Sequence, residues 1–579
     1  MICAWMSILS RVRMSKVDRK ESRLMDKEIT VSFKQGSGRP ARKISKGPSL
    51  KSLKLRQELY RGQLIQVQSH LGKESKSFWR YKQEFAREIS HRWQSSKRQD
   101  LLNAIAKAKY LLLGDFHALH QSQKSHLRLL KQIPQKKEMV LFLECFDQKD
   151  QPVLQRWSEG KLSDRELLKA VDWNHRWGFP WESYRPLLKW CQRHQIPLIA
   201  MNDSQVEDLK KRDHLAAELI AHYRAQYPHK LFVIIDGDMH LAKKHLPTDL
   251  EKKLGADFAN HNVRVFQNLE DIYFQMMRQG IENHIDVIKF QKNVYSIQSV
   301  PPWVKWHNYL MFLEKKYDPQ FEDGEDGIDY SDHVHQFVKI LAHDLEFQNI
   351  PEGYAIYTMD EEELWNRLES LESQDQKKWF EAMIQENESF YLPEQQWGYL
   401  AQTSVNHAAS LAMLILYSEW SGWQKWPMKM PQDFISLIWV ETIAYLGSKF
   451  INHKRKTDTL ADVKASFLAQ ETEDQGREAF KLTLSQKMKE FMFLQSGKRS
   501  KESFRPRRKQ SYRQSARLLG GMLGEKLYHG YHKNLLSLEN LKRLLKKNIQ
   551  MEKFEEYYFE SIEWIDSLPE PFRSKKEKL

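Results

Sequence analysis

Two copies of a Gly-x-x-His pattern, each directly after a short apolar run, constrain the fold of this chain more than any other feature. The first copy, Gly-Asp-Phe-His at 114–117, follows the run 110–113, and the second, Gly-Asp-Met-His at 237–240, follows the run 231–235. In open parallel sheets, ligands bind beyond the carboxyl ends of the strands, where glycine permits a tight turn. We therefore expect the two histidines to face one pocket.

Between about 109 and 300, short β-rich runs alternate with longer amphipathic stretches. This alternation predicts an α/β fold with a mostly parallel sheet and crossover helices. A capping box at 163–166, Ser-Asp-Arg-Glu, opens one of the crossover helices. The expected strands are 110–113, 139–143, 197–201, 231–235 and 263–266.

Beyond residue 331 the strand signal is weak, and amphipathic helical patterns follow one another. They predict an all-α C-terminal domain. Three glycines in this region, Gly520, Gly521 and Gly524, fit either a close approach between two helices or a flexible bend. The expected helices include 334–345, 361–371, 397–417, 434–450, 516–528 and 535–545.

A chain of 579 residues is long enough for two or more domains, each with its own core. The sequence predicts a basic disordered lead over 1–50, an α/β domain over 51–300, a linker over 301–330 and a helical domain over 331–579. The linker contains an acidic, glycine-bearing stretch at 322–329 that fails the ligand spacing of an EF-hand.

Composition excludes several classes of protein. A hydrophobic share of 41% with 29% charged residues is typical of a folded, soluble chain, and three scattered cysteines fit neither a disulfide framework nor a zinc ribbon. We expect no membrane span, because the best candidate, 434–447, is short and carries Glu441. The start of the chain lacks a signal-peptide profile, which favours the cytoplasm.

The net charge of +15 raises the question of nucleic acid. The excess lies in the first sixty residues and around 498–517, and basic tails of this kind are usually solvated. No nucleic-acid-binding motif accompanies them, so we do not expect specific nucleic-acid binding.

The ends of the expected strands collect polar side chains. If the strands are parallel neighbours, these groups gather at one edge of the sheet, where His117 and His240 could hold a metal ion or act with Glu144 as general base and orienting partner. His120, three residues after His117, would share its helix face and extend the cluster. The other strand-end groups are Asp115, Asn202, Asp203, Asp236 and Asp238. A lone histidine after a strand more often has a structural role, but two copies with Glu144 between them favour a pocket.

An aromatic stretch at 173–184 follows the second strand. Trp173 and Tyr184 could wall a pocket for a flat ligand, with Arg176 available for carboxylates. The same aromatic residues could equally pack the long crossover onto the sheet.

Taken together, these motifs resemble the ChaN-like haem-binding family of the Tiki and erythromycin-esterase superfamily. The resemblance covers roughly 95–300 and rests on 113–117 (Leu-Gly-Asp-Phe-His), 143–146 (Leu-Glu-Cys-Phe), 151–160, 173–184, 199–202 (Ile-Ala-Met-Asn) and 236–240 (Asp-Gly-Asp-Met-His). It implies an α/β domain with a pocket over the sheet that binds haem or iron. Related branches imply a hydrolase that uses His and Glu, in some cases with a divalent metal.

Carried over residue by residue, the resemblance implies functional roles for His117, Glu144 and His240, with His117 and His240 as metal ligands in the hydrolase. Asp115 stands where these families usually have glutamate, and a shorter side chain puts hydrolysis in doubt. Tyr184 is a candidate haem ligand. ChaN proteins are typically lipoproteins, and this chain shows no lipobox, which puts haem uptake at the cell surface in doubt. The expected ligand-binding residues are Gly114, Asp115, His120, Trp173, Arg176, Tyr184, Asn202, Gly237 and Asp238.

Three functions therefore remain open from the sequence. The leading one is a pocket for haem, iron or another small molecule at the strand ends. The alternatives are a hydrolase, with or without a divalent metal, and a non-catalytic scaffold.

Overall fold

The computed structural model describes residues 52–90, 92–134, 137–317, 331–359, 361–469, 474–499 and 504–572. The basic lead expected over 1–50 and the acidic stretch at 322–329 lie outside these residues. The described residues pack into two compact units. The α/β unit comprises 74–267 and 289–295, and the helical unit comprises 52–73, 268–288 and the residues from 296 onward. The domain boundaries expected from the sequence stay predictions, because this grouping does not test which parts fold alone.

An eight-stranded sheet, built largely from the α/β unit, has the order β1-β7-β8-β6-β2-β5-β3-β4. β2 pairs in parallel with β5 and β6, and β3 pairs in parallel with β4 and β5. These five strands correspond to the five runs expected from the sequence, although β4 begins one residue later than expected, at Leu198. Their residues are almost all buried, as in a sheet covered on both faces. The strands are β1 (Gln94–Ser96), β2 (Tyr110–Asp115), β3 (Met139–Asp147), β4 (Leu198–Asn202), β5 (Leu231–Gly237), β6 (Asn262–Gln267), β7 (Val287–Gln291) and β8 (Val294–Ile297).

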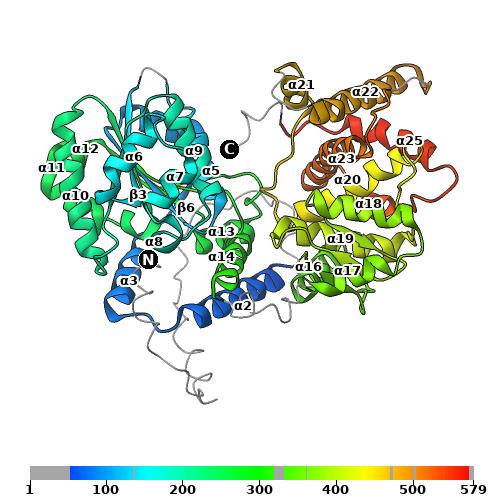
Figure 1. The fold of residues 1–579 in the computed structure, drawn as a ribbon, viewed down its shortest axis with the longest axis horizontal. Helices are drawn as coiled ribbons and strands as arrows, with labels where there is room; N and C mark the ends of the chain where they lie inside the picture. The colour runs from blue at the N-terminus through cyan, green and yellow to red at the C-terminus, as the bar shows by residue number, and fades with distance from the viewer. Residues whose placement is uncertain are drawn as a thin grey trace, which may run out of the picture. The chain divides into compact units, whose positions relative to one another are not determined.

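Helices connect the parallel strands, because a parallel pair needs a crossover. The expected capping box is present: Ser163 N donates to Glu166 Oε2 at 2.7 Å, and Glu166 N donates to Ser163 Oγ at 3.3 Å. The helices of this unit are α3 (Lys76–Ile89), α4 (Arg98–Lys107), α5 (His120–Leu130), α6 (Gln151–Ser158), α7 (Asp164–Ala170), α8 (Trp173–Arg176), α9 (Trp181–Arg193), α10 (Leu209–Gln226), α11 (Leu246–Leu254) and α12 (Ala256–His261), with 3₁₀ turns η5 (Gln148–Asp150) and η6 (Asp238–Leu241). Figure 1 shows them around the strands, which confirms the expected α/β class with a helical C-terminal region.

The helical unit adds a small sheet that the sequence did not predict. Its strands β9 (Ala355–Tyr357), β10 (Phe390–Leu392) and β11 (Trp397–Tyr399) have three residues each and the order β10-β11-β9. The helix expected over 397–417 therefore begins later, at Val405, where Ser404 Oγ caps it by accepting from His407 N. The helices are α2 (Leu53–Leu71), α13 (Glu270–Gln279), α14 (Pro302–Tyr317), α16 (Ser331–Asp344), α17 (Glu362–Glu369), α18 (Gln374–Gln385), α19 (Val405–Ser421), α20 (Phe434–Ile451), α21 (Leu460–Leu468), α22 (Asp474–Ser496), α23 (Lys509–His532), α24 (Leu538–Leu545) and α25 (Phe554–Ser567).

Gly520 and Gly524 of α23 permit a close crossing with α20, and Gly521 lies against Thr457. A Cβ on Gly520 would lie 2.7 Å from the Glu441 backbone, and one on Gly524 would lie 2.9 Å from the Thr442 carbonyl oxygen. α23 runs without interruption from Lys509 to His532. Of the two interpretations that the sequence left open, the structure shows the close approach.

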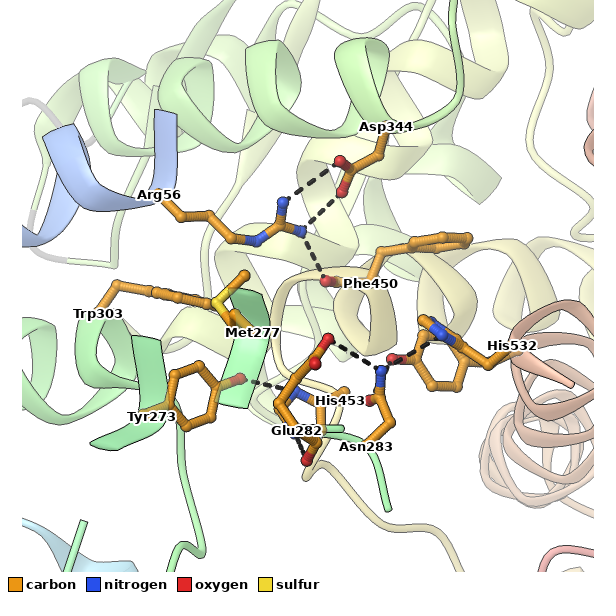
Figure 2. Close-up of a pocket in the computed structure, with 11 residues that line it drawn as sticks. Arg56, Tyr273, Met277, Glu282, Asn283, Trp303, Asp344, Phe450, His453 and His532 are labelled. Carbon is orange, nitrogen blue, oxygen red and sulfur yellow. Dashed lines mark hydrogen bonds and ion pairs between the residues drawn. The ribbon is translucent and has the colours of Figure 1, made fainter. Parts of the chain in front are cut away.

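A fully buried ion pair joins three segments of the helical unit (Figure 2). Arg56 of α2 donates to both carboxylate oxygens of Asp344, at 3.2 and 2.6 Å, and to the Phe450 carbonyl oxygen at 3.0 Å. The adjacent cavity, about 10 Å³, has room for about one water. Arg56 and Asp344 thus neutralise each other inside the core.

Within the described residues, one helix has the length and apolar composition of a membrane span. This helix is α20, and 83% of its apolar window is buried inside the structure. A core helix of a folded unit has the same properties, so α20 is weak evidence for a span.

Candidate functional site

The register of the sheet brings the strand-end groups to one level. Leu113 of β2 and Leu143 of β3 both pair with Ile235 of β5, which lies between them. Each strand then continues into polar residues: Asp115 ends β2, Glu144 follows Leu143, and Asp236 follows Ile235. The two histidines come directly after, His117 in the turn before α5 and His240 in η6. The sequence thus correctly placed both motifs at one edge of the sheet.

The first histidine is buried and oriented by a carboxylate. His117 Nδ1 donates to Asp115 Oδ2 at 2.9 Å, and the aromatic rings of Trp177 and Phe179 pack against the imidazole. Burial raises the pKa of Asp115, but hydrogen bonds from His117 and His126 outweigh it and hold the pKa below its usual value. Asp115, although shorter than glutamate, therefore reaches the imidazole, whose Nε2 is left facing the cluster.

The second histidine has the same arrangement, built from other elements. His240 Nδ1 donates to Asp213 Oδ1 of α10 at 2.6 Å, and the Tyr81 hydroxyl of α3 donates to Asp213 Oδ2 at 2.9 Å. Burial lowers the pKa of His240, but the carboxylates of Asp236 and Asp213 outweigh burial and raise it to about 9. Tyr81 also stacks on His245, with ring centroids 3.5 Å apart, which holds the tyrosine in place.

Glu144 lies between the two imidazoles. Its Oε2 is 3.5 Å from His117 Nε2 and accepts a hydrogen bond from Gly237 N at 2.8 Å, while its Oε1 is 4.0 Å from His240 Nε2. Burial raises the pKa of Glu144, but the two histidines outweigh it and hold the pKa below its usual value. Glu144 is therefore the ionised carboxylate at the centre of the cluster.

Asp236 completes a group that could hold a metal ion. Ligand atoms of Glu144, Asp236 and His240 all lie within 4.8 Å of one another. Burial raises the pKa of Asp236 well above its usual value, and the neighbouring Glu144 carboxylate adds to this rise. Two carboxylates this close cannot both ionise easily without a cation, so one of them keeps a proton.

The glycines of both motifs make this packing possible. A Cβ on Gly114 would lie 1.8 Å from Asp238 Oδ1, which accepts a hydrogen bond from Gln267 N at 3.0 Å. A Cβ on Gly237 would lie 3.4 to 3.6 Å from His240 Cδ2, Glu144 Oε2 and His117 Nε2. Gly237 therefore leaves a space bordered by the three residues to which the resemblance gives functional roles.

His120 does not join this cluster. α5 begins at His120, so His117 precedes the helix and the two residues do not share a helical face. Burial lowers the pKa of His120 to about 4, and nearby Lys124 and Arg128 lower it further. Its charged neighbours are thus the basic residues of α5.

Three other expected ligand-binding residues, Trp173, Arg176 and Asn202, border a separate cavity of about 10 Å³. Arg176 forms ion pairs with Asp147 and, at 2.8 Å, with Asp150, so its charge is already neutralised. Trp173 Nε1 donates to the Phe179 carbonyl oxygen at 2.7 Å. In this part of the chain the aromatic residues pack the crossover onto the sheet, which was one of the two interpretations of the sequence.

Tyr184 borders the cavity beside His117 and Glu144, which also measures about 10 Å³. Its hydroxyl lies 3.5 Å from the His117 carbonyl oxygen, and burial raises its pKa well above the usual value. A cavity of this size admits about one water, whereas pockets for larger ligands measure roughly 300–1,000 Å³. Haem does not fit into either of the two cavities at this edge.

Asp213 and Tyr81 were not found from the sequence, and Asp236 was noted there only as a strand-end group. Asp213 lies within α10 and Tyr81 within α3, and neither has a motif or a strand end to mark it. What distinguishes them is that a carboxylate and a phenol are buried on otherwise amphipathic helices. A single sequence does not reveal this burial. Asp236 directly precedes the second motif, so its position was available.

Comparisons with known proteins find similarity in the part of the chain that contains the first motif. Residues 101–208 match the family described as "Haem-binding uptake, Tiki superfamily, ChaN". The matched segment contains His117 and Glu144 but ends before Gly237 and His240. No curated protein matches the chain significantly. One solved structure, with cofacial haem binding to ChaN of Campylobacter jejuni, matches with 13% identity and a TM-score of 0.26 over 30% of this chain and 88% of that chain.

The family match confirms the resemblance that the motifs suggested, over the segment that carries the first histidine and the central glutamate. Over residues 101–208, the chain is similar to the ChaN-type haem-binding uptake family of the Tiki superfamily.

Proposed function

We propose that the cluster at the strand ends is a divalent transition-metal centre that activates water for hydrolysis. One observation carries the proposal: both imidazoles are held at Nδ1 by a carboxylate, His117 by Asp115 and His240 by Asp213. Metal-binding histidines almost always donate their second ring N–H to such a partner, which fixes the tautomer and leaves the other nitrogen free for the ion.

The residues of the cluster fit a metal ion of the zinc, iron or manganese class. His117 Nε2 is buried and has no hydrogen-bond partner, although Glu144 Oε2 is 3.5 Å away. The space beside Gly237 borders this nitrogen, Glu144 and His240. The two imidazole nitrogens and the Asp236 carboxylate form a mixed nitrogen and oxygen donor set, which such ions prefer, and the Glu144 carboxylate lies beside them.

A bound divalent ion would supply Lewis acidity and lower the pKa of a water molecule in the site. The side chains of the chain do the rest. Gly237 N holds Glu144 Oε2 in position, and the depressed pKa of Glu144 keeps this carboxylate available to accept a proton. Tyr81 and Asp213 fix the ring of His240, so that its Nε2 stays directed at Glu144.

The same geometry favours an ion over an enclosed haem. The cavity beside His117 and Glu144 measures about 10 Å³. A tyrosine that binds haem iron does so through its phenol oxygen. The Tyr184 phenol is buried, and its raised pKa disfavours the ionised oxygen that would bind iron. Iron as an ion remains a candidate, since imidazole and carboxylate ligands suit it as well as zinc.

Metal titration of the full chain tests the proposal. After chelator treatment, calorimetry with Zn²⁺, Mn²⁺ and Fe²⁺ is expected to show one ion per chain, with release of protons. His117→Ala and His240→Ala should each weaken binding by more than 100-fold, and Asp213→Asn by roughly 10- to 100-fold. His175→Ala, at an exposed histidine of the same unit, is the control and should change nothing.

Activity and haem provide the deciding readouts. The metal-loaded chain should hydrolyse simple activated esters, and Glu144→Gln should lower kcat while the metal stays bound. Stoichiometric binding of haemin with a Soret shift that Tyr184→Phe abolishes, together with no bound metal, would replace the proposal by haem binding. Absence of both ion and haem would leave the scaffold as the function.

A further inference from the structure

A second cavity lies wholly within the helical unit and measures about 180 Å³. Its lining is half apolar and half polar. The apolar part comes from Leu411, Leu414, Trp426, Ala444 and Tyr445, and the polar part from Ser389, His407, Ser410, Glu441, Arg455 and Arg517. Nothing in the resemblance or the comparisons reaches these residues.

Residues from three helices, α19, α20 and α23, line this cavity. α19 contributes His407, Ser410, Leu411 and Leu414, whose spacing of three, four and seven residues is that of a single helical face. α20 contributes Glu441, Ala444 and Tyr445 with the same periodicity. The close crossing at Gly520 brings α23 against the Glu441 backbone, which places Arg517, one turn earlier, at the same cavity.

Arg455 is part-buried and has no ion-pair partner among the described residues. It donates to Ser410 Oγ at 3.0 Å and to Ser448 Oγ, and its guanidinium lies over the Tyr445 ring. In the described part of the chain, no carboxylate lies within ion-pair distance of it. Arg56, in the same unit, has Asp344 at 2.6 Å. Glu441 and Glu525 lie near enough to act on the charge of Arg455 but do not pair with it. A cation that lines a cavity and whose hydrogen bonds go only to hydroxyls can still accept an anion as a direct partner.

The neighbouring polar groups also present hydrogen-bond donors. Arg517 is paired with Glu388 at 2.6 Å, and its Nε is 4.0 Å from Glu441 Oε1, so part of its guanidinium remains for a ligand. Ser389 Oγ accepts from Ala401 N at 3.0 Å, which leaves its hydroxyl proton for His407 Nδ1, 3.0 Å away. In this arrangement, a neutral His407 carries its proton on Nε2 and is a donor there.

We propose that this cavity binds a small monocarboxylic acid with an apolar body of about six carbons. The carboxylate would lie between Arg455 and Arg517, with His407 as a third donor. The apolar body would lie against Leu411, Leu414 and Ala444. This site is independent of the metal centre proposed above.

The volume sets the size of the ligand. A cavity of roughly 150 Å³ lined by apolar side chains accepts benzene. The 180 Å³ of this cavity therefore accommodate a six-membered ring together with one carboxylate, and are too small for a nucleotide or a haem.

A matched set of probes tests charge and shape separately. Calorimetry of the full chain at pH 7 with benzoate or hexanoate is expected to give a Kd on the order of 1 mM or below. Benzyl alcohol, which keeps the ring and lacks the charge, should bind at least tenfold more weakly. Inorganic phosphate, which has charge and no apolar body, should also bind at least tenfold more weakly.

Two substitutions locate the site. Arg455→Met should weaken benzoate binding at least tenfold, and Ala444→Phe, which fills the cavity and keeps the charges, should abolish it. Arg367→Met, at an exposed arginine paired with Glu363 at 2.9 Å, is the control and should bind as the unaltered chain does.

Each failure has a defined meaning. No binding of either benzoate or hexanoate to the unaltered chain overturns the proposal, and this result needs no variant to fold. Equal binding of benzyl alcohol refutes the role of the arginines, and equal binding of phosphate refutes the apolar half. Binding that survives Ala444→Phe in a folded variant places the acid elsewhere.

Discussion

The strand-end cluster and the cavity of the helical unit solve the burial of charge in opposite ways. In the cluster, His117 and His240 each touch a carboxylate, and the adjacent space holds about one water. In the cavity, the Arg455 side chain donates hydrogen bonds to two hydroxyls and forms no ion pair among the described residues, beside about 180 Å³ of space. In the first region each imidazole is paired with a carboxylate in a tightly packed site, whereas in the second the guanidinium of Arg455 borders a larger space without an ion-pair partner among the described residues.

This difference determines how much the stability of each region depends on a single charged side chain. Removal of one member of a buried, paired network leaves the other member unpaired at a large cost in stability. Removal of a charge that has no ion-pair partner leaves no opposite charge unpaired in direct contact. The stability of the two regions should therefore respond very differently to the loss of one charged residue.

The largest effect is expected at Asp213. Asp213→Ala removes the buried carboxylate that accepts from both His240 and Tyr81 and leaves these two groups only each other, at 2.8 Å, so the free energy of unfolding should fall by about 3–5 kcal/mol. Urea unfolding followed by circular dichroism measures it. Asp208→Ala, which removes only the cap of the same helix, should cost about 1 kcal/mol. Equal effects of the two substitutions would contradict the paired network.

Next in size is the pH dependence, which should have opposite signs in the two regions. The pKa of His240 is raised to about 9, so its stabilising contribution is complete below pH 6.5 and is lost as the pH rises through 9. Burial and the nearby Arg455 and Arg517 lower the pKa of His407 to about 4, so its contribution is present above pH 6.5 and lost as the pH falls through 4. Each amounts to on the order of 3 kcal/mol at most.

The difference in unfolding free energy between the unaltered chain and a His→Gln variant isolates each histidine. For His240→Gln without metal, this difference should shrink from pH 6.5 to 9, and for His407→Gln it should shrink from pH 6.5 to 4. A difference that stays constant across either window would rule out the corresponding pKa shift.

A steric change in the cluster should have an intermediate effect. Gly114→Ala forces Asp238 away and breaks its hydrogen bond with Gln267 N, which should cost roughly 1–3 kcal/mol. Gly62→Ala, where an added Cβ meets nothing within 4 Å, is the matched control and should not destabilise. A tolerated Gly114→Ala would mean that the motif glycine serves something other than packing.

The smallest effect is expected at the arginine of the cavity. Arg455→Met in the absence of any ligand should change the unfolding free energy by less than about 1 kcal/mol, because burial disfavours this charge and, in the described part of the chain, no carboxylate lies within ion-pair distance of it. Thermal unfolding measures the change, with Arg56→Met as the paired counterpart, for which a loss of about 3–5 kcal/mol is expected. Similar losses at both positions would remove the distinction between the two regions.

The parts of the fold that follow from local patterns could be predicted from the sequence. The five central strands and the capping box of Ser163 are encoded by neighbouring residues, and the two histidines follow strands whose carboxyl ends a parallel sheet brings together. The strand at Trp397–Tyr399 was missed, because a three-residue strand has no periodicity of its own and exists only through pairing with distant segments.

The partners within the site could be predicted only in part. Glu144 was found because it directly ends an apolar run, whereas Asp213 and Tyr81 reach His240 from helices whose side chains gain their meaning only after packing. Arg176 looked available in sequence, but Asp147 and Asp150 neutralise it in the fold. Cavities likewise depend on how helices cross, and no single segment encodes the space around Arg455.

The contact between Gly114 and Asp238 makes substitutions in the two copies of the motif depend on each other. A relative with a larger residue at position 114 is expected to have a smaller residue in place of Asp238, because a Cβ at 114 and the Asp238 carboxylate would occupy the same space. The copies are therefore expected to drift together among relatives, and a change in only one of them would mark a chain in which this edge of the sheet has taken up another task.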